Sequence, residues 1–104
     1  MLNLTKSSFE NTIAKGKVLV DFYTDWCGHC RVVKPVLEEL EAKYINSVTV
    51  AKVDADNERD IANRYGIKNY PTIVLFEDGK EIAREIGAHP LGVFEKMIKK
   101  EEKQ

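Results

Sequence analysis

The sequence has few cysteines, few prolines and no long apolar segment, and each scarcity excludes a class of protein. Its 104 residues include two cysteines and three prolines. Two cysteines cannot build the disulfide framework that small secreted domains need. The longest uninterrupted apolar run, Ile73–Phe76, is too short to span a membrane, and the N-terminal segment lacks the apolar core of a signal peptide. We therefore expect a cytoplasmic protein that has no membrane partner.

The chain also lacks an excess of charge of either sign. Sixteen basic side chains balance 17 acidic ones, which gives a net charge of −1. A nucleic-acid-binding protein normally presents a basic face, so we expect no nucleic-acid partner. With 43% hydrophobic residues the chain can bury one core, and residues 1–104 are expected to form a single, monomeric domain. The C-terminal block of alternating charges, residues 99–104, is predicted to be a solvated helix end.

Strand-like and helix-like segments alternate along the chain. The first helix is expected to begin at a capping box formed by Ser7 and Glu10, and the turn Asp78-Gly79 predicts a hairpin. Alternation of this kind favours parallel strands covered by helices on both faces, and the hairpin adds an antiparallel edge. The predicted fold class is α/β, with three layers, a mixed five-stranded sheet and four helices. The predicted strands are 2–4, 18–23, 47–54, 72–76 and 80–86, and the later helices are 30–44, 57–65 and one that begins at Pro90.

The segment Cys27-Gly28-His29-Cys30 follows a predicted buried strand and precedes a helix. A spacer of two residues lets one helical turn bring both sulfurs within bonding distance, so the pair indicates a redox site. The helix N-terminus favours a thiolate at Cys27, a protonated His29 would add to this effect, and Asp25 would oppose it. We expect Cys27 to be exposed and Cys30 to be covered.

Two other uses of this pair of cysteines remain open. The pair is half of a tetrahedral zinc site, but the chain offers only His29 and His89 to complete it, and His29 is poorly aimed. A structural disulfide that closes so small a loop would contribute less stability than one closing a long loop. We expect neither a metal ion nor another cofactor.

An aspartate, Asp21, lies in the middle of an otherwise apolar predicted strand. A charged group is costly to bury, so we expect burial to raise the pKa of Asp21 and to let it exchange a proton with the buried sulfur. Lys52, on the predicted neighbouring strand, is the expected counter-charge. The alternative is that Asp21 lies at a sheet edge and that Lys52 merely extends into solvent.

Two further segments contain candidate binding residues. Trp26 precedes the first cysteine, where an indole can shield a thiolate and offer a flat docking surface, although a lone tryptophan is more often a core or anchor residue. Tyr70-Pro71-Thr72 lies between a predicted helix and a predicted strand. The sequence alone favours a trans bond before Pro71.

Taken together, these motifs resemble the thioredoxin family. The resemblance runs through F-Y-x-x-W-C-G-H-C at residues 22–30, with Asp21, Lys52, Pro71-Thr72 and Gly87 in the family's order and spacing, and it covers essentially the whole chain. It implies the thioredoxin fold with strand order 1-3-2-4-5. It implies that Cys27 is the attacking nucleophile and Cys30 the resolving cysteine. It also implies that Asp21 is the buried carboxylate and Pro71 a cis-proline that faces the disulfide, and that the substrate groove is lined by Trp26, Gly28, Tyr70, Thr72 and Gly87.

One departure from the family pattern leaves the direction of electron flow open. Thioredoxins carry proline where this chain has His29, and His29 together with Tyr70 resembles protein disulfide isomerase domains. Those domains usually carry glutamate in place of Asp21. Our first hypothesis is a thioredoxin-type enzyme that reduces disulfide-containing proteins and is recycled by a thioredoxin reductase. The alternatives are an isomerase- or oxidase-like domain in an oxidising compartment, and a non-enzymatic interaction module.

Overall fold

The structure is a computed structural model, and it describes residues 1–100. Strands and helices alternate in the predicted order. The end of the charged C-terminal block, for which a solvated helix end was predicted, lies outside the described residues. The elements are β1 (Leu2–Asn3), α1 (Phe9–Ile13), β2 (Lys17–Tyr23), α2 (Gly28–Lys43), β3 (Thr49–Asp54), α3 (Arg59–Arg64), β4 (Thr72–Glu77), β5 (Lys80–Ile86) and α4 (Leu91–Lys100).

The five strands form one mixed sheet in the order β1-β3-β2-β4-β5, which confirms the order that the resemblance implied. The strands β1, β3 and β2 are parallel, whereas β4 is antiparallel to β2 and β5 is antiparallel to β4. The strand β2 therefore lies at the centre of the sheet, with a hydrogen-bonded neighbour on each side.

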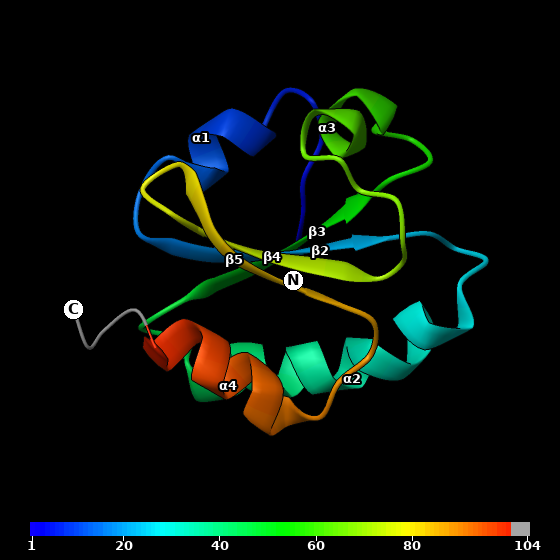
Figure 1. Cartoon of the computed structure of the whole chain (residues 1–104). Coiled ribbons are helices and arrows are strands. Elements are labelled where there is room, and N and C mark those ends of the chain that lie inside the picture. The colour runs from blue at the N-terminus through cyan, green and yellow to red at the C-terminus, as the bar shows by residue number, and fades with distance from the viewer. Residues whose placement is uncertain (101–104) are drawn as a thin grey trace.

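The helices cover both faces of the sheet, α1 and α3 on one face and α2 and α4 on the other (Figure 1). Successive side chains of a strand point to opposite faces. Val18, Val20 and Phe22 of β2 accordingly belong to the core under α1 and α3, whereas Leu19 belongs to the core under α2 and α4. The same alternation places Asp21 on the α2 side of the central strand.

Helix α1 begins differently from the prediction. Its N-cap is Ser8 rather than Ser7, and no side chain caps the helix, so the predicted capping box is wrong. The Ser8 hydroxyl instead accepts the Thr5 N–H at 3.0 Å, and Glu10 forms an ion pair with Arg64 of α3. Tertiary pairing between α1 and α3 thus takes the carboxylate that local capping would have used.

Helix α2 begins at Gly28, two residues before the predicted start, because Cys27 itself caps the helix. Pro90 directly precedes α4 rather than forming its first residue. The predicted hairpin turn is confirmed, since Asp78 and Gly79 both have positive φ angles, of 51° and 88°. Among the described helices, none combines the length and the apolar character needed to cross a bilayer.

We predict that Leu37→Ala lowers the free energy of unfolding by about 2–5 kcal/mol, because Leu37 is fully buried between α2 and the sheet. The control is Val32→Ala on the same helix, where 63% of the side chain is exposed and the expected loss is small. Urea unfolding followed by circular dichroism measures both values. Equal losses in the two variants would contradict the assignment of this helix face to the core.

Candidate active site

The two cysteines are free thiols at the first turn of α2. The Cys30 backbone N–H donates to the Cys27 Sγ at 3.1 Å, and the Cys27 thiol donates to the Tyr70 carbonyl at 3.4 Å. An N–H group directed at sulfur from a helix start stabilises negative charge there. The Cys27 sulfur thus lies at the helix start, where it both accepts and donates a hydrogen bond.

Exposure does not distinguish the two cysteines, contrary to our expectation, because Cys27 is 7% exposed and Cys30 5%. The surroundings of Cys30, however, clearly disfavour its charged form. Burial raises the pKa of the Cys30 thiol to about 12, and its hydrogen bond with Cys27 adds to this, against a smaller lowering by a backbone hydrogen bond from Thr24. Near neutral pH Cys30 is therefore held as a protonated thiol.

Asp21 lies beneath this turn and is only 4% exposed. It belongs to the central strand, in register with Lys52 of β3 on one side and Ile73 of β4 on the other, which excludes the alternative of a position at the sheet edge. Burial raises the pKa of Asp21 to about 7, and the positive charge of Lys52 partly opposes this. Near neutral pH the carboxyl group can therefore both accept and donate a proton.

Lys52 is half-buried and interacts with two residues of the site, Tyr23 and Asp21. Its Nζ lies 5.6 Å from the centre of the Tyr23 ring, a cation–π contact, and its charge acts on Asp21. Lys52 also lines the cavity next to Asp21.

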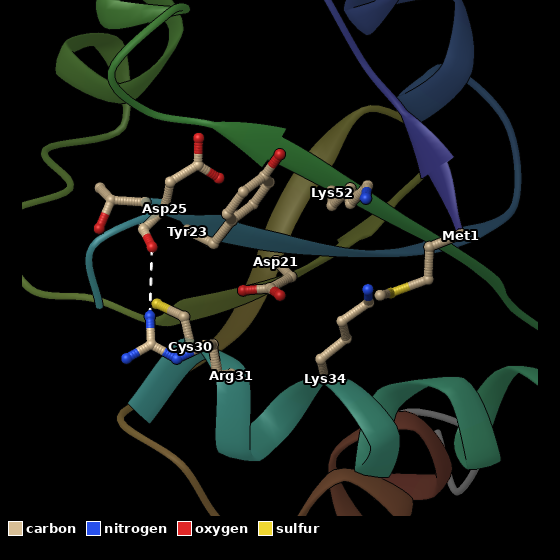
Figure 2. A pocket seen from close by; sticks show the side chains of 9 residues that line it. Met1, Asp21, Tyr23, Asp25, Cys30, Arg31, Lys34 and Lys52 are labelled. Atoms are coloured by element: carbon tan, nitrogen blue, oxygen red, sulfur yellow. Dashed lines mark hydrogen bonds between the residues drawn. The ribbon is translucent and has the colours of Figure 1, made fainter. Parts of the chain in front are cut away.

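A cavity of about 260 Å³ connects Asp21 with Cys30 (Figure 2). Met1, Lys52 and Tyr23 line it from the sheet side, and Arg31 and Lys34 line it from α2. The guanidinium of Arg31 donates to the backbone carbonyl of Asp25 at 3.2 Å, which ties the loop before Cys27 to the first turn of α2. Asp21 and Cys30 thus line the same cavity.

Trp26 lies on the surface beside Cys27, with 68% of its area exposed. Its indole N–H donates to an Asp56 carboxylate oxygen at 2.9 Å, and its ring packs edge-on against Tyr70, with 6.0 Å between ring centres. Trp26 is therefore a surface residue with a fixed orientation, not a core residue. Sequence reasoning missed Asp56, because 30 residues separate it from Trp26 and only the fold brings the two together.

The segment opposite the cysteines is held at several points. The Tyr70–Pro71 peptide bond is cis, as the resemblance implied. The Gly87 N–H donates to the Pro71 carbonyl at 2.8 Å, and Gly87 has a φ of 96°, which glycine adopts without strain. The Thr72 hydroxyl donates to the Asn69 carbonyl at 2.6 Å. These contacts place Tyr70, Pro71 and Gly87 together beside Cys27.

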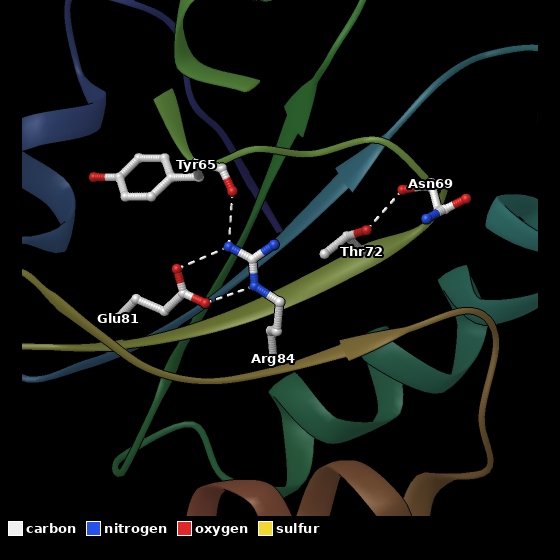
Figure 3. A network of polar contacts seen from close by, with 5 residues as sticks. All are labelled: Tyr65, Asn69, Thr72, Glu81 and Arg84. Atoms are coloured by element: carbon white, nitrogen blue, oxygen red, sulfur yellow. Dashed lines mark hydrogen bonds and ion pairs between the residues drawn. The ribbon is translucent and has the colours of Figure 1, made fainter. Parts of the chain in front are cut away.

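The other end of this segment is fixed by Arg84 of β5 (Figure 3). Its guanidinium donates to the Tyr65 carbonyl at 2.8 Å and to both carboxylate oxygens of Glu81, at 2.6 and 2.9 Å. Tyr65 directly follows α3 as its C-cap residue. Arg84 therefore links the edge strand β5 to the start of the loop that leads to Tyr70. No motif in the sequence marked this contact.

Three remaining candidates lie around the cysteines. Gly28 is the first residue of α2, and Gly28, His29 and Asp25 are all exposed. His89, the other histidine considered for zinc, contacts the Ile86 carbonyl at 2.8 Å on the loop after β5. Within residues 1–100, no three His, Cys, Asp or Glu side chains are grouped so as to hold a metal ion.

Comparison with known proteins agrees with this geometry. The sequence model of the thioredoxin family matches residues 1–100. A thioredoxin of Chlamydia caviae is 44% identical over 84 residues, which is 81% of this chain and 81% of that protein. A thioredoxin of Chlamydia trachomatis is 40% identical over 97 residues, 93% of this chain and 94% of that protein.

A solved structure shares the fold as well as the sequence. Its title concerns thiol resolution in a yeast mitochondrial 1-Cys peroxiredoxin by the glutathione and thioredoxin systems. The matched chain superposes with a TM-score of 0.88 at 37% identity, over 96% of this chain and 94% of its own length.

We predict that the free energy of unfolding of the reduced protein falls as the pH rises from about 4 to about 7. In this pH range Asp21 keeps its proton in the folded protein and loses it in the unfolded chain. The reason is that the pKa of Asp21 is about 7 in the fold, against 3.8 for an ordinary aspartate. The full loss amounts to about 4 kcal/mol at most. Asp21→Asn should remove this slope, and urea unfolding at several pH values measures it.

The matched control is Glu38→Gln, which neutralises an exposed carboxylate on α2. This variant should keep the pH dependence of the wild type. A slope that persists unchanged in Asp21→Asn would show that another group, and not Asp21, takes up the proton on folding.

Proposed function

This chain belongs to the thioredoxin family, and we propose that Cys27 and Cys30 carry the thiol–disulfide exchange by which it reduces protein disulfides. The observation that supports this assignment best is the difference between the surroundings of the two sulfur atoms. Cys27 receives an N–H bond at the helix start, whereas Cys30 is a buried thiol of raised pKa next to a buried carboxyl group. The first arrangement suits an attacking thiolate, and the second suits a thiol that reacts only after it loses a proton.

The proposed reaction has two steps. The Cys27 thiolate attacks a substrate disulfide, so a bond forms between Cys27 and one substrate sulfur while the other sulfur leaves as a thiolate and takes up a proton. Asp21 then accepts the proton of Cys30, whose thiolate attacks Cys27 and releases the second substrate sulfur. Two electrons pass from the dithiol to the substrate, and the enzyme is left with a Cys27–Cys30 disulfide.

The surface around Cys27 suits an extended peptide. Trp26 and Ile86 are both exposed, Trp26 packs against Tyr70, and Ile86 pairs with Thr72, the residue after the cis-proline. We propose that Trp26, Tyr70, Pro71 and Gly87 receive the substrate chain, with Gly28 leaving room at the start of α2. Thr72 and Lys52 contribute indirectly. The Thr72 hydroxyl holds the loop by its hydrogen bond, and the positive charge of Lys52 lowers the pKa of Asp21.

The partners of the reaction follow from its chemistry. A catalyst that leaves each cycle as a disulfide needs an electron source, and we propose a thioredoxin reductase in this role. We also propose a cytoplasmic, monomeric protein, because a reducing compartment keeps such a dithiol available for substrates. The alternative of an isomerase- or oxidase-like domain is not favoured, since the curated relatives that match are thioredoxins.

We predict that Cys27→Ser abolishes disulfide reduction and that Cys30→Ser accumulates mixed disulfides between Cys27 and substrate. Only the second variant retains the attacking sulfur while lacking the resolving one. Mass spectrometry of adducts after incubation with insulin, a disulfide-containing protein, distinguishes the two. Equal trapping by both variants would contradict the assigned roles.

We predict that His29→Pro makes the Cys27–Cys30 disulfide more reducing. A protonated imidazole beside Cys27 stabilises the thiolate of the reduced form, and stabilising the reduced form raises the potential. The wild type should lie between about −270 mV, the value of thioredoxin, and about −180 mV, that of protein disulfide isomerase. Equilibration with glutathione buffers measures both potentials.

The control variant His29→Ala separates the loss of the imidazole from the gain of proline. It should shift the potential in the same direction as His29→Pro. If neither variant becomes more reducing, His29 does not set the potential.

A further inference from the structure

Two buried oxygen atoms at the active site have no hydrogen-bond partner among the described residues. They are the Asp21 Oδ1 and the Thr24 Oγ1. Asp21 is 4% exposed and Thr24 2%, and both side chains line the cavity that also contains Cys30. Figure 2 shows the Asp21 carboxyl and the Cys30 sulfur facing this space. The function proposed above uses Asp21 and Cys30 but gives the Thr24 hydroxyl no role.

We propose that the Thr24 hydroxyl is a positioning group on the proton path from Cys30 to Asp21, where it orients the solvent that links thiol and carboxyl. This inference rests on the proposed function and assigns it one further residue. A buried hydroxyl without a protein partner costs free energy, and valine would fill nearly the same volume without this cost. The oxygen is therefore expected to find its hydrogen bonds within the cavity.

The cavity has the size that such a path requires. A water molecule needs roughly 10–15 Å³ of this kind of volume and two to four polar partners. The cavity measures about 260 Å³, and Asp21, Thr24 and Cys30 are all among the residues that line it. A hydroxyl both donates and accepts hydrogen bonds, so it can orient the solvent between the thiol and the carboxyl group.

The backbone of Thr24 already holds both cysteines. Its carbonyl accepts the Cys27 N–H at 3.4 Å, and a backbone hydrogen bond from Thr24 lowers the pKa of Cys30. These contacts fix the side chain at a constant place relative to the two sulfurs. A substitution that keeps the backbone and removes only the hydroxyl therefore isolates its contribution.

The proton balance is closed within the site. The Cys30 S–H bond breaks, its proton passes through the Thr24-oriented solvent to the Asp21 carboxylate, and the resulting thiolate attacks Cys27. The bond between Cys27 and the substrate breaks, and the substrate thiolate takes up a proton from Asp21 or from solvent. Thr24 orients the solvent and is chemically unchanged throughout.

Other titratable groups also act on Asp21 and must stay constant in a test. Lys52 faces it from β3, Tyr23 from β2 and Asp25 from the loop, and α2 contributes Arg31 and Lys34. All of them remain in a Thr24→Val variant. A changed pH profile in that variant is therefore due to the hydroxyl.

The test uses a symmetric aryl disulfide whose released thiolate absorbs visible light. Attack by Cys27 releases the first equivalent, and attack by Cys30 on the mixed disulfide releases the second, so stopped-flow absorbance separates the two steps. In Thr24→Val we expect the second phase to slow by about tenfold, less than the roughly 10²-fold or more that a positioned acid or base contributes, because Thr24 orients solvent and does not itself accept the proton. The first phase should keep its rate, and the pH dependence of the second should shift to higher pH.

Three variants complete the design. Thr24→Ser restores the hydroxyl and should restore the second phase, whereas Thr24→Ala removes it without adding a methyl group and should behave like Thr24→Val. Thr12→Val, which removes a hydroxyl bonded at 2.8 Å to the Ser8 carbonyl on α1, should leave both phases unchanged. Thr24→Val should also unfold at the same or a higher urea concentration than the wild type, because its hydroxyl has no protein partner to lose.

The outcomes separate this inference from the function on which it rests. A second phase within twofold of the wild type in Thr24→Val, or one that is equally slow in Thr24→Ser, would overturn the role of the hydroxyl. Slowing of both phases together would overturn it as well, since it would indicate a distorted site. Failure of Cys30→Ser to trap a mixed disulfide would instead overturn the proposed function, whatever Thr24 does.

Discussion

The burial of one carboxyl group, that of Asp21, is the constraint on which this site depends. A carboxylate in the middle of a central strand is among the least favourable placements in a small domain. The start of α2 covers the sheet face on which Asp21 lies. It thereby places the Cys30 thiol on the same cavity as the carboxyl group. Lys52 on the adjacent strand offsets only part of the desolvation cost, so the pKa of Asp21 stays near 7. A stronger ion pair would stabilise the fold and remove the base.

The same geometry gives two cysteines that are three residues apart different surroundings. The helix that begins at Gly28 directs an N–H group at Cys27 and turns Cys30 inward toward Asp21. One element therefore positions both sulfurs of the proposed reaction, the one that would attack and the one that would resolve the mixed disulfide. The loop that faces them is fixed from two sides, by Gly87 at Pro71 and by Arg84 at Tyr65. This leaves Trp26 and the cis-proline segment as a surface of constant shape beside a reactive sulfur.

Much of this could be predicted from the sequence, and the rest could not for identifiable reasons. The alternation of apolar strands and helices predicted the layers, and Asp21 among apolar residues predicted a buried acid, because both signals are local. The start of α1 was mispredicted because Glu10 pairs with Arg64, a partner 54 residues away. Asp56 and Arg84 escaped notice for the same reason, since each acts across the fold. The role proposed for Thr24 depends on a cavity, which no sequence pattern describes.

The most direct test of the account is the titration of the Asp21 carboxyl carbon by nuclear magnetic resonance in the reduced protein. Aspartate labelled with ¹³C at the carboxyl position allows this signal to be assigned by comparison with Asp21→Asn. We expect a midpoint of about 7 and a second, smaller displacement when Cys30 titrates, because the two groups share one cavity. A midpoint near 4, the ordinary value of an exposed aspartate, would contradict the account, since Asp21 would then be too weak a base for Cys30.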